Sequence, residues 1–212
     1  MATASQSLFN MTVASDNAGG NQGLLMPKLQ FRFRVNFLNF GVDAAGGLAL
    51  TKQVVDVTRP NLTFDEVTLN VYNSRIYLAG KHTWSELTIN VRDDASGTVS
   101  RAVGQQLQKQ LDFVEQASAA TGQDYKFQTN IEVLDGGNGT SAPIVLETWE
   151  CYGCFLKGAN YGSLNYATND PAQIALQIRY DNAVNSPLSS GIGTSVGRAF
   201  GGASSTGIGG TT

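Results

Sequence analysis

The chain has 212 residues, of which 42% are hydrophobic and 15% are charged, and its formal net charge is −3. This length fits one domain with appendages, and the negative charge argues against a protein that grips nucleic acid electrostatically. No apolar run approaches the roughly 20 residues needed to cross a membrane. The first basic residue is Lys28 and no apolar stretch precedes it, so we expect no Sec signal peptide and synthesis in the cytoplasm.

The share of charged residues is low, because ordinary soluble domains contain roughly 25%. Gly, Ser, Thr, Asn and Gln replace the missing charges. Such a surface is polar but easily desolvated, and it suits permanent contact with other chains. A secreted β protein with an ordinary low-charge surface remains an alternative on composition alone.

The composition divides the chain into three predicted parts. Residues 1–26 are rich in Ala, Ser, Asn and Gly and form an N-terminal arm, and residues 183–212 form a Gly/Ser-rich C-terminal arm. Neither arm has enough apolar residues to fold alone, so we expect a neighbouring chain to order them. Residues 27–182 carry the periodic hydrophobic pattern of a β domain.

Strict alternation of apolar and polar residues predicts three strands in the first third of this domain. The clearest runs from Leu29 to Phe37, with every second residue facing the core. The glycine-rich stretch Gly41 to Leu50 is predicted as a loop. Strands follow at Val54–Thr58 and Phe64–Tyr72. The inward residues of the last strand are Val67, Leu69 and Val71.

The stretch Arg75 to Ser118 predicts strand, turn, strand and helix. Arg75–Ala79 is the first strand, Gly80-Lys81 marks a tight turn, and Thr83–Arg92 is the second strand. Asp93, Asp94 and Ser96 suit a helix start, because short acceptors and negative charge satisfy the free N–H groups there. Gly122 is expected to cap the helix end. The predicted packing stripe of this amphipathic helix is Val99, Val103, Leu107, Leu111 and Val114.

Three more strands are predicted in the rest of the domain, at Tyr125–Val133, Ile144–Phe155 and Gln173–Tyr180. The glycine-rich stretch 135–140 is a good hairpin turn, and Lys157 to Asn169 is predicted as a loop. About eight strands with short connections favour antiparallel pairing. The predicted fold class is therefore mainly β, an antiparallel sandwich or barrel with one amphipathic helix and two extended arms.

No set of residues predicts catalysis, a metal site or a cofactor. His82 is the only histidine and follows a predicted turn, and no nucleophile elbow surrounds any serine. The carboxylates are dispersed and form no acid–base pair. Glu147 and Trp149 share a strand face, which is too little for a sugar-binding platform. We therefore expect a protein that is not an enzyme.

Cys151 and Cys154 form a C-Y-G-C motif that lacks a second pair or a histidine cluster to complete a zinc site. On a strand, residues three apart face opposite sides, so the two thiols pair poorly with each other unless a bulge intervenes. The plain interpretation is two small buried residues. The sharper hypothesis is that one thiol forms a disulfide with an adjacent subunit.

The sequence resembles the tail tube proteins of contractile-tailed bacteriophages, which are related to type VI secretion tube proteins. The resemblance rests on Leu78-Ala79-Gly80-Lys81-His82-Thr83-Trp84, the alternating strand Leu87–Val91 and Asp93-Asp94. It also rests on a strand at 146–155, a glycine-containing loop at 158–166 and the last alternating strand at 173–180. The two arms depart from the compact members of the family.

The resemblance implies a homohexameric ring. The rings stack into a tube inside a contractile sheath, in the tail of a virion made in the host cytoplasm. It also implies partners: other copies of the chain, the sheath, the tape-measure protein and the baseplate and terminator proteins. DNA would pass through the lumen without specific binding, and no membrane is involved. The lumen-facing residues expected on this basis are Thr68, Asn70, Thr88 and Asn90, with the helix stripe packed on the outer side of the tube.

Two alternatives remain at this point. A type VI secretion tube protein would share the fold but carry effectors in place of a genome, and neighbouring genes would distinguish the two. A monomeric β-sandwich that binds carbohydrate would need an aromatic platform, which the sequence does not show.

Overall fold

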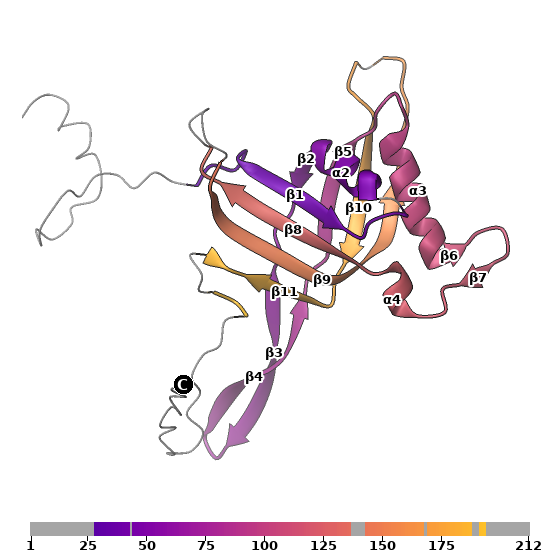
Figure 1. Cartoon of the computed structure of the whole chain (residues 1–212). Coiled ribbons are helices and arrows are strands. Elements are labelled where there is room, and N and C mark those ends of the chain that lie inside the picture. Colours follow the sequence, from indigo (N-terminus) through magenta and orange to yellow (C-terminus); the bar gives the residue numbers. More distant parts are fainter. Residues whose placement is uncertain (1–27, 43, 137–142, 168, 188–190, 194–212) are drawn as a thin grey trace, which may run out of the picture.

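The computed structural model describes residues 28–42, 44–136, 143–167, 169–187 and 191–193. These residues form a mainly β, antiparallel fold, as predicted, with more elements than the pattern indicated (Figure 1). The strands are β1 (Phe33–Leu38), β2 (Val54–Val57), β3 (Leu62–Val71), β4 (Ser74–Trp84), β5 (Leu87–Arg92), β6 (Leu111–Asp112), β7 (Ala117–Ser118), β8 (Phe127–Leu134), β9 (Val145–Asn160), β10 (Gln173–Arg179) and β11 (Asn182–Asn185). The helices are α2 (Ala44–Lys52), α3 (Thr98–Gln110) and α4 (Gly122–Tyr125).

Seven strands form one antiparallel sheet in the order β1-β8-β9-β10-β5-β2, with β11 also paired to β9. Over the described residues its two outermost strands, β1 and β2, are not paired with each other, so the sheet is open. The hairpin β3–β4 and the short pair β6–β7 form separate two-stranded sheets. Figure 1 shows the long hairpin β3–β4 extending away from the main sheet.

Strand β9 joins the two halves of the sheet. Its first part pairs with β8 and β11, and its last part pairs with β10. A register shift against β8 adds one residue to β9 beside Gly153, whose φ of 65° lies in the left-handed region. A side chain at Gly153 would collide with the carboxylate of Asp181. Glycine is therefore required at this bulge, which bends the strand.

The core lies between the inner faces of the sheet and helix α3. Leu87, Ile89 and Val91 of β5 are fully buried, as predicted, and the alternating apolar residues of β8 and β10 surround them. Gln110 of α3 anchors the helix to β9, because its side chain donates to the carbonyl of Leu156 and accepts from the Leu156 N–H, both at 2.9 Å. This satisfies polar groups that would otherwise be costly to bury.

The prediction of a loop at Gly41–Leu50 is wrong, because helix α2 spans Ala44–Lys52. The helix lies so close to β1 that a side chain at Gly47 would come within 2.9 Å of the Phe37 carbonyl oxygen. Leu50 is fully buried on the same helix. The glycines therefore permit close helix–strand packing, where composition alone indicated a flexible loop.

The predicted turn at Gly80-Lys81 is also wrong. Strand β4 runs without interruption from Ser74 to Trp84, and the hairpin turns at Tyr72-Asn73. A register shift leaves Gly80 and Lys81 of β4 opposite Asp65 alone, so the bulge lies in β4 at Gly80, where an added side chain would come within 3.0 Å of the Asp65 carbonyl oxygen. The glycine serves close backbone approach at a bulge and not a chain reversal.

The predicted helix stripe is correct only in its first part. Val99 and Val103 are fully buried, and Leu107 packs against the core. The helix ends at Gln110, so Leu111 lies in β6, and Val114 is 88% exposed. The apolar residues Leu111 and Val114 keep the helical spacing beyond the helix end, but the chain there forms the small hairpin β6–β7. The predicted Gly122 cap instead opens α4.

Several boundaries differ from the prediction, and the predicted strand Thr83–Arg92 is divided between the end of β4 and β5. β1 begins at Phe33, and Phe31 is 74% exposed, because a turn closed by the Arg32 N–H and the Leu29 carbonyl precedes the strand. β9 continues to Asn160, into the predicted loop. The boundary predicted between 182 and 183 falls inside β11. The predicted arm 1–26 and most of the predicted arm 183–212 lie outside the described residues.

Candidate self-assembly surface

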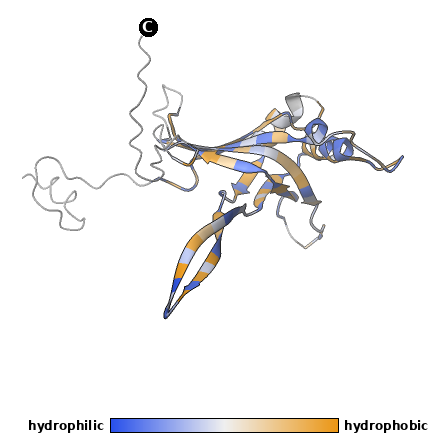
Figure 2. Cartoon of the chain, turned by 90° about the horizontal axis from the view of Figure 1, so that it is seen from below, coloured by the Kyte–Doolittle hydropathy of each residue, from blue (hydrophilic) through white to orange (hydrophobic). Residues whose placement is uncertain are grey.

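The hairpin β3–β4 carries an apolar face that nothing in the described chain covers. Antiparallel register places Val67 opposite Leu78 and Leu69 opposite Ile76, so their side chains share one face with Val71. These five side chains are 45–49% exposed. Figure 2 shows the hydrophobic residues along the hairpin where it stands clear of the rest of the molecule. We refer to Val67, Leu69, Val71, Ile76 and Leu78 as the hairpin apolar face.

The exposure of this face is energetically unfavourable for an isolated chain. A two-stranded hairpin is marginally stable in water, and an independent sheet needs further strands or a covering layer. Contiguous exposed apolar patches on soluble proteins are typical of interaction sites. The prediction that Val67, Leu69 and Val71 point inward is therefore wrong for the single chain, because no core residue of the same chain lies opposite them. The geometry indicates that another molecule covers them.

The opposite face of the hairpin is polar. Thr68 pairs with Tyr77 and Asn70 pairs with Arg75. Thr68 and Asn70, two of the residues predicted to face a lumen, therefore lie on the side away from the hairpin apolar face. Both are exposed.

The other two predicted lumen residues lie in the main sheet. The Thr88 N–H donates to Thr58 Oγ1 at 2.8 Å, and Asn90 Nδ2 donates to Asp56 Oδ1 at 2.9 Å. Alternation along β5 places the Thr88 and Asn90 side chains on the face opposite its buried residues. One chain does not bring them into the same sheet as Thr68 and Asn70, so their common position on a lumen stays a prediction about an assembly.

Cys151 and Cys154 are both fully buried and free. The bulge at Gly153 brings both onto the inner face, where Cys154 Sγ donates to the Cys151 carbonyl oxygen at 3.3 Å. Burial raises the pKa of both thiols, to about 11 for Cys154. The hypothesis of a disulfide to an adjacent subunit is contradicted by this burial, because neither sulfur reaches the surface of the folded chain.

Glu147 is a buried carboxylate whose role the sequence did not reveal. Its Oε1 accepts from Trp149 Nε1 at 2.8 Å and from Asn185 Nδ2 at 3.1 Å, and Lys28 forms an ion pair with Oε2. Burial acts to raise the pKa of Glu147, but the hydrogen bonds from Lys28, Asn185 and Trp149 and the charge of Lys28 outweigh burial and lower it. Trp149 is only 9% exposed, so this pair does not form a sugar platform.

Helix α3 begins in a cluster of short acceptors, as predicted. Gly97 precedes the helix and provides no side-chain cap. Asp94 takes that place, because its carboxylate accepts from the Val99 N–H at 3.1 Å and from the hydroxyls of Ser96 and Thr98. The hydrogen bonds from Ser96, Thr98 and Val99 lower the pKa of Asp94 to about 2.

Within the described residues, no group of three or more His, Cys, Asp or Glu side chains could hold a metal ion. His82 lies in β4 and not in a turn, and its ring contacts Phe64 and Trp84. In that same part of the chain, no helix is both long and apolar enough to span a bilayer.

Neither the family models nor the curated proteins contain a match to this sequence. Solved structures do match. A chain of the anti-feeding prophage baseplate is 16% identical with a TM-score of 0.53, over 76% of this chain and 97% of the other. A chain of the sheath–tube complex of the PVC extracellular contractile injection system is 13% identical with a TM-score of 0.55, covering 78% and 95%. A chain of the anti-feeding prophage tube-terminating cap is 11% identical with a TM-score of 0.56, covering 82% and 100%.

These matches span nearly the whole length of the known chains, so the likeness concerns a complete fold and not a shared fragment. The chain has the fold of the chains that it matches in these contractile injection assemblies. At these identities the likeness establishes the fold alone.

Proposed function

We propose that this chain is a tube subunit of a contractile injection particle, with six copies in each ring and the rings stacked into a tube. The single observation that carries this proposal is the hairpin apolar face, which is uncovered in a fold shared with tube proteins. An exposed apolar ribbon in a chain with few surface charges is a surface for permanent association. We further propose the tail of a bacteriophage as the particle, with the sheath, tape-measure, baseplate and terminator proteins as its partners.

The proposed role of the tube is passive conduction of the genome. The polar face of the hairpin carries Thr68 and Asn70 beside one cation, Arg75, and β5 presents Thr88 and Asn90. The neutral side chains hydrate a wall without holding phosphates, because strong DNA binding needs several Lys and Arg residues to release counterions. We propose no catalytic role, since the described residues hold neither a metal-binding cluster nor a nucleophile paired with His82.

Negative-stain electron microscopy of the purified chain tests the proposal. We expect six-fold rings or tubes that increase with protein concentration, since association depends on mass action. A matched variant, Leu69→Ser, should give fewer assemblies, whereas Asn70→Ser on the opposite face should behave as wild type. A protein that sediments as a monomer at every concentration and shows neither rings nor tubes would overturn the proposal.

The cargo is tested separately on particles purified from a host that expresses the full gene cluster. We expect mass spectrometry to find this chain together with a sheath protein, and nuclease-protected DNA in the same particles. Particles that contain this chain and toxin proteins but no DNA would assign it to a protein-injecting system with the same fold.

A further inference from the structure

The hairpin β3–β4 and the loop between β9 and β10 lie at opposite ends of the same strand pair. β5 and β10 are antiparallel, with Leu87 opposite Ile178 at one end and Arg92 opposite Gln173 at the other. The hairpin enters β5 at the Leu87 end, and the loop between β9 and β10, described at 161–167 and 169–172, enters β10 at the Gln173 end. Figure 1 shows the hairpin pointing down and the loop standing above α3. The two features therefore cannot meet within one chain.

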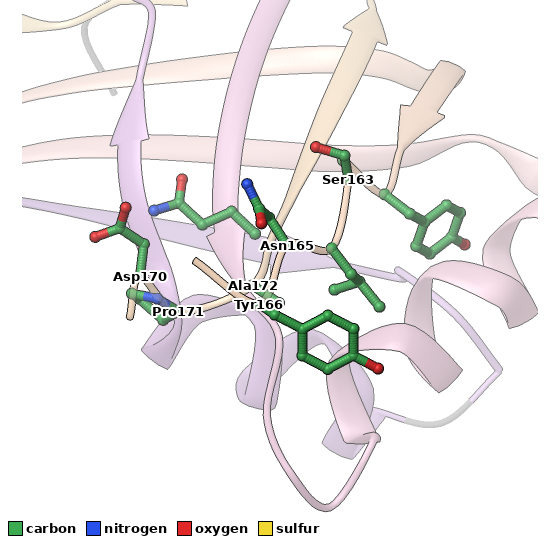
Figure 3. A pocket seen from close by; sticks show the side chains of 10 residues that line it. Ser163, Asn165, Tyr166, Asp170, Pro171 and Ala172 are labelled. Atoms are coloured by element: carbon green, nitrogen blue, oxygen red, sulfur yellow. The ribbon is translucent and has the colours of Figure 1, made fainter. Parts of the chain in front are cut away.

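The β9–β10 loop encloses an open cavity of about 630 Å³. Tyr161, Leu164 and Tyr166 line it, of which Tyr161 is half-exposed and the other two are almost fully or fully exposed. Asp170 also lines it, and no lining residue is basic. Figure 3 shows Tyr166 and Asp170 projecting from different parts of this loop. The cavity thus combines exposed aromatic and aliphatic surface with one negative charge.

The loop around the cavity is held in place by local hydrogen bonds. Asn160 Oδ1 accepts from the Gly162 N–H at 2.9 Å, and Asn165 Oδ1 accepts from the Ala167 N–H at 2.9 Å. The Asp93 N–H donates to the Ala172 carbonyl at 2.9 Å, which fastens the loop to the end of β5. These bonds present Leu164 and Tyr166 outward and leave them without apolar cover.

The tip of the hairpin carries the complementary groups. Tyr72 is fully exposed and has a φ of 40°, in the region that favours glycine. The two-residue turn Tyr72-Asn73 requires this positive φ, and it holds the Tyr72 ring out at the tip, where no residue of the described chain covers it. Arg75 lies close to the tip, is exposed, and has no ion pair within the described chain. The tip therefore presents one aromatic ring and one positive charge.

We propose that the hairpin tip of one copy docks in the β9–β10 cavity of a second copy, with Tyr72 against Tyr161, Leu164 and Tyr166, and Arg75 facing Asp170. This inference rests on the proposed function, and it identifies the surfaces that join successive rings. The occupant is a second copy because the opposite charges and the two apolar surfaces occur on the same chain at opposite ends. A head-to-tail contact between surfaces at opposite ends of a subunit extends the assembly from one ring to the next, which gives a tube of indefinite length.

A charge-swap cycle tests the contact. We expect Arg75→Glu and Asp170→Arg each to shorten tubes at least several-fold in electron micrographs, with six-fold rings still present, because the interfaces within a ring are unchanged. The double variant Arg75→Glu with Asp170→Arg places opposite charges together again in every copy and should restore tube length. Arg59→Glu, a charge reversal at an exposed residue outside both surfaces, is the matched control and should keep wild-type length.

A second variant tests the aromatic part. Tyr72→Gly removes the ring and fits the φ of 40° without strain. It should leave the melting temperature of the free subunit unchanged or higher while shortening the tubes. Circular dichroism of each variant checks that the subunit is folded.

The results separate the two proposals. Absence of rings and tubes in the wild type would reject the tube function itself. Wild-type tubes with single swaps of unchanged length, or shortened single swaps that the double variant does not restore, would overturn the docking contact and leave the tube function standing.

Discussion

Strands β5 and β3 carry the same alternation but have opposite surroundings. Leu87, Ile89 and Val91 of β5 are fully buried. Val67, Leu69 and Val71 of β3, spaced in the same way, are 45–47% exposed. The pattern selects which residues share a face in both strands. It does not tell whether the covering layer belongs to the same chain, and that difference separates the folding core from the assembly surface.

The largest effect on the free subunit is expected in β5. Ile89→Ala should lower the free energy of unfolding by about 2–5 kcal/mol, because it leaves a cavity in a fully packed core. The measurement is urea denaturation of the unassembled subunit. Leu69→Ala is the matched variant in β3 and should cost about 1 kcal/mol or less, the worth of one cross-strand pair. Equal losses for the two variants would mean that the hairpin belongs to the core.

The second prediction reverses this ranking in the assembly. Leu69→Ala should raise the protein concentration needed for tube formation about tenfold or more, because six such sites repeat in every ring. Light scattering across a concentration series measures this threshold. An Ile89→Ala subunit that still folds should assemble at a threshold closer to the wild type, and the opposite order would contradict the assignment of the two faces.

The third prediction concerns the start of α3, which packs on the core. The loss of stability at this position should be smaller than the loss caused by Ile89→Ala. The pKa of Asp94 falls from an ordinary 3.8 to about 2 in the folded chain. The ionised carboxylate therefore stabilises the fold above pH 3.8, and this contribution is lost as the pH falls toward 2. Asp94→Ala should melt below the wild type at pH 6.

Melting curves from pH 6 to pH 2 provide the check on Asp94. The gap in melting temperature between wild type and Asp94→Ala should narrow at the acid end. Asp112→Ala is a comparison outside the helix, in the β6–β7 turn, where hydrogen bonds from Val114 and Glu115 also lower the carboxyl pKa. A difference in melting temperature between wild type and Asp94→Ala that stays constant from pH 6 to pH 2 would contradict the stabilising role of the ionised Asp94 carboxylate.

The smallest effect is expected at the two thiols. Cys151 and Cys154 are fully buried with raised pKa values, so alkylating reagents should modify neither until the chain unfolds. Mass spectrometry after brief iodoacetamide treatment measures this, with a urea-unfolded sample as the positive control. Non-reducing gels of assembled tubes should show only monomer, and a dimer band from tubes alkylated at lysis would contradict the buried geometry.

The parts of the structure that sequence predicted best are those with local causes. β8, β10 and the β5 core residues followed from strict alternation, and Asp94 followed from the needs of a helix start. The predictions that were wrong concern contacts between segments that are distant in the sequence. Gly47 and Gly80 looked like loop and turn residues, yet each permits close approach to a backbone carbonyl from another element, Phe37 and Asp65 respectively.

The assembly surface divides in the same way. The sequence placed Val67, Leu69 and Val71 on one face and Thr68 and Asn70 on the other, and the structure has this division. The predicted strands end at Tyr72 and begin again at Arg75, on either side of the observed turn, but their pairing was missed, and this pairing joins Ile76 and Leu78 to the same apolar face. A turn-forming Asn73-Ser74 between two alternating runs was the available signal, and the glycine at position 80 was more prominent.

The mainly β class, the inner and outer faces of the strands and the start of helix α3 follow from sequence alone, because side-chain periodicity and end capping are local properties of the chain. Three features emerge only when the chain folds: β3–β4 stands away from the sheet, Cys151 and Cys154 share the inner side of a bulge, and a cavity lies at the Gln173 end of β10. These depend on which segments pack together. Packing is a property of residues far apart in the chain, and their order in the sequence does not encode it in any single pattern.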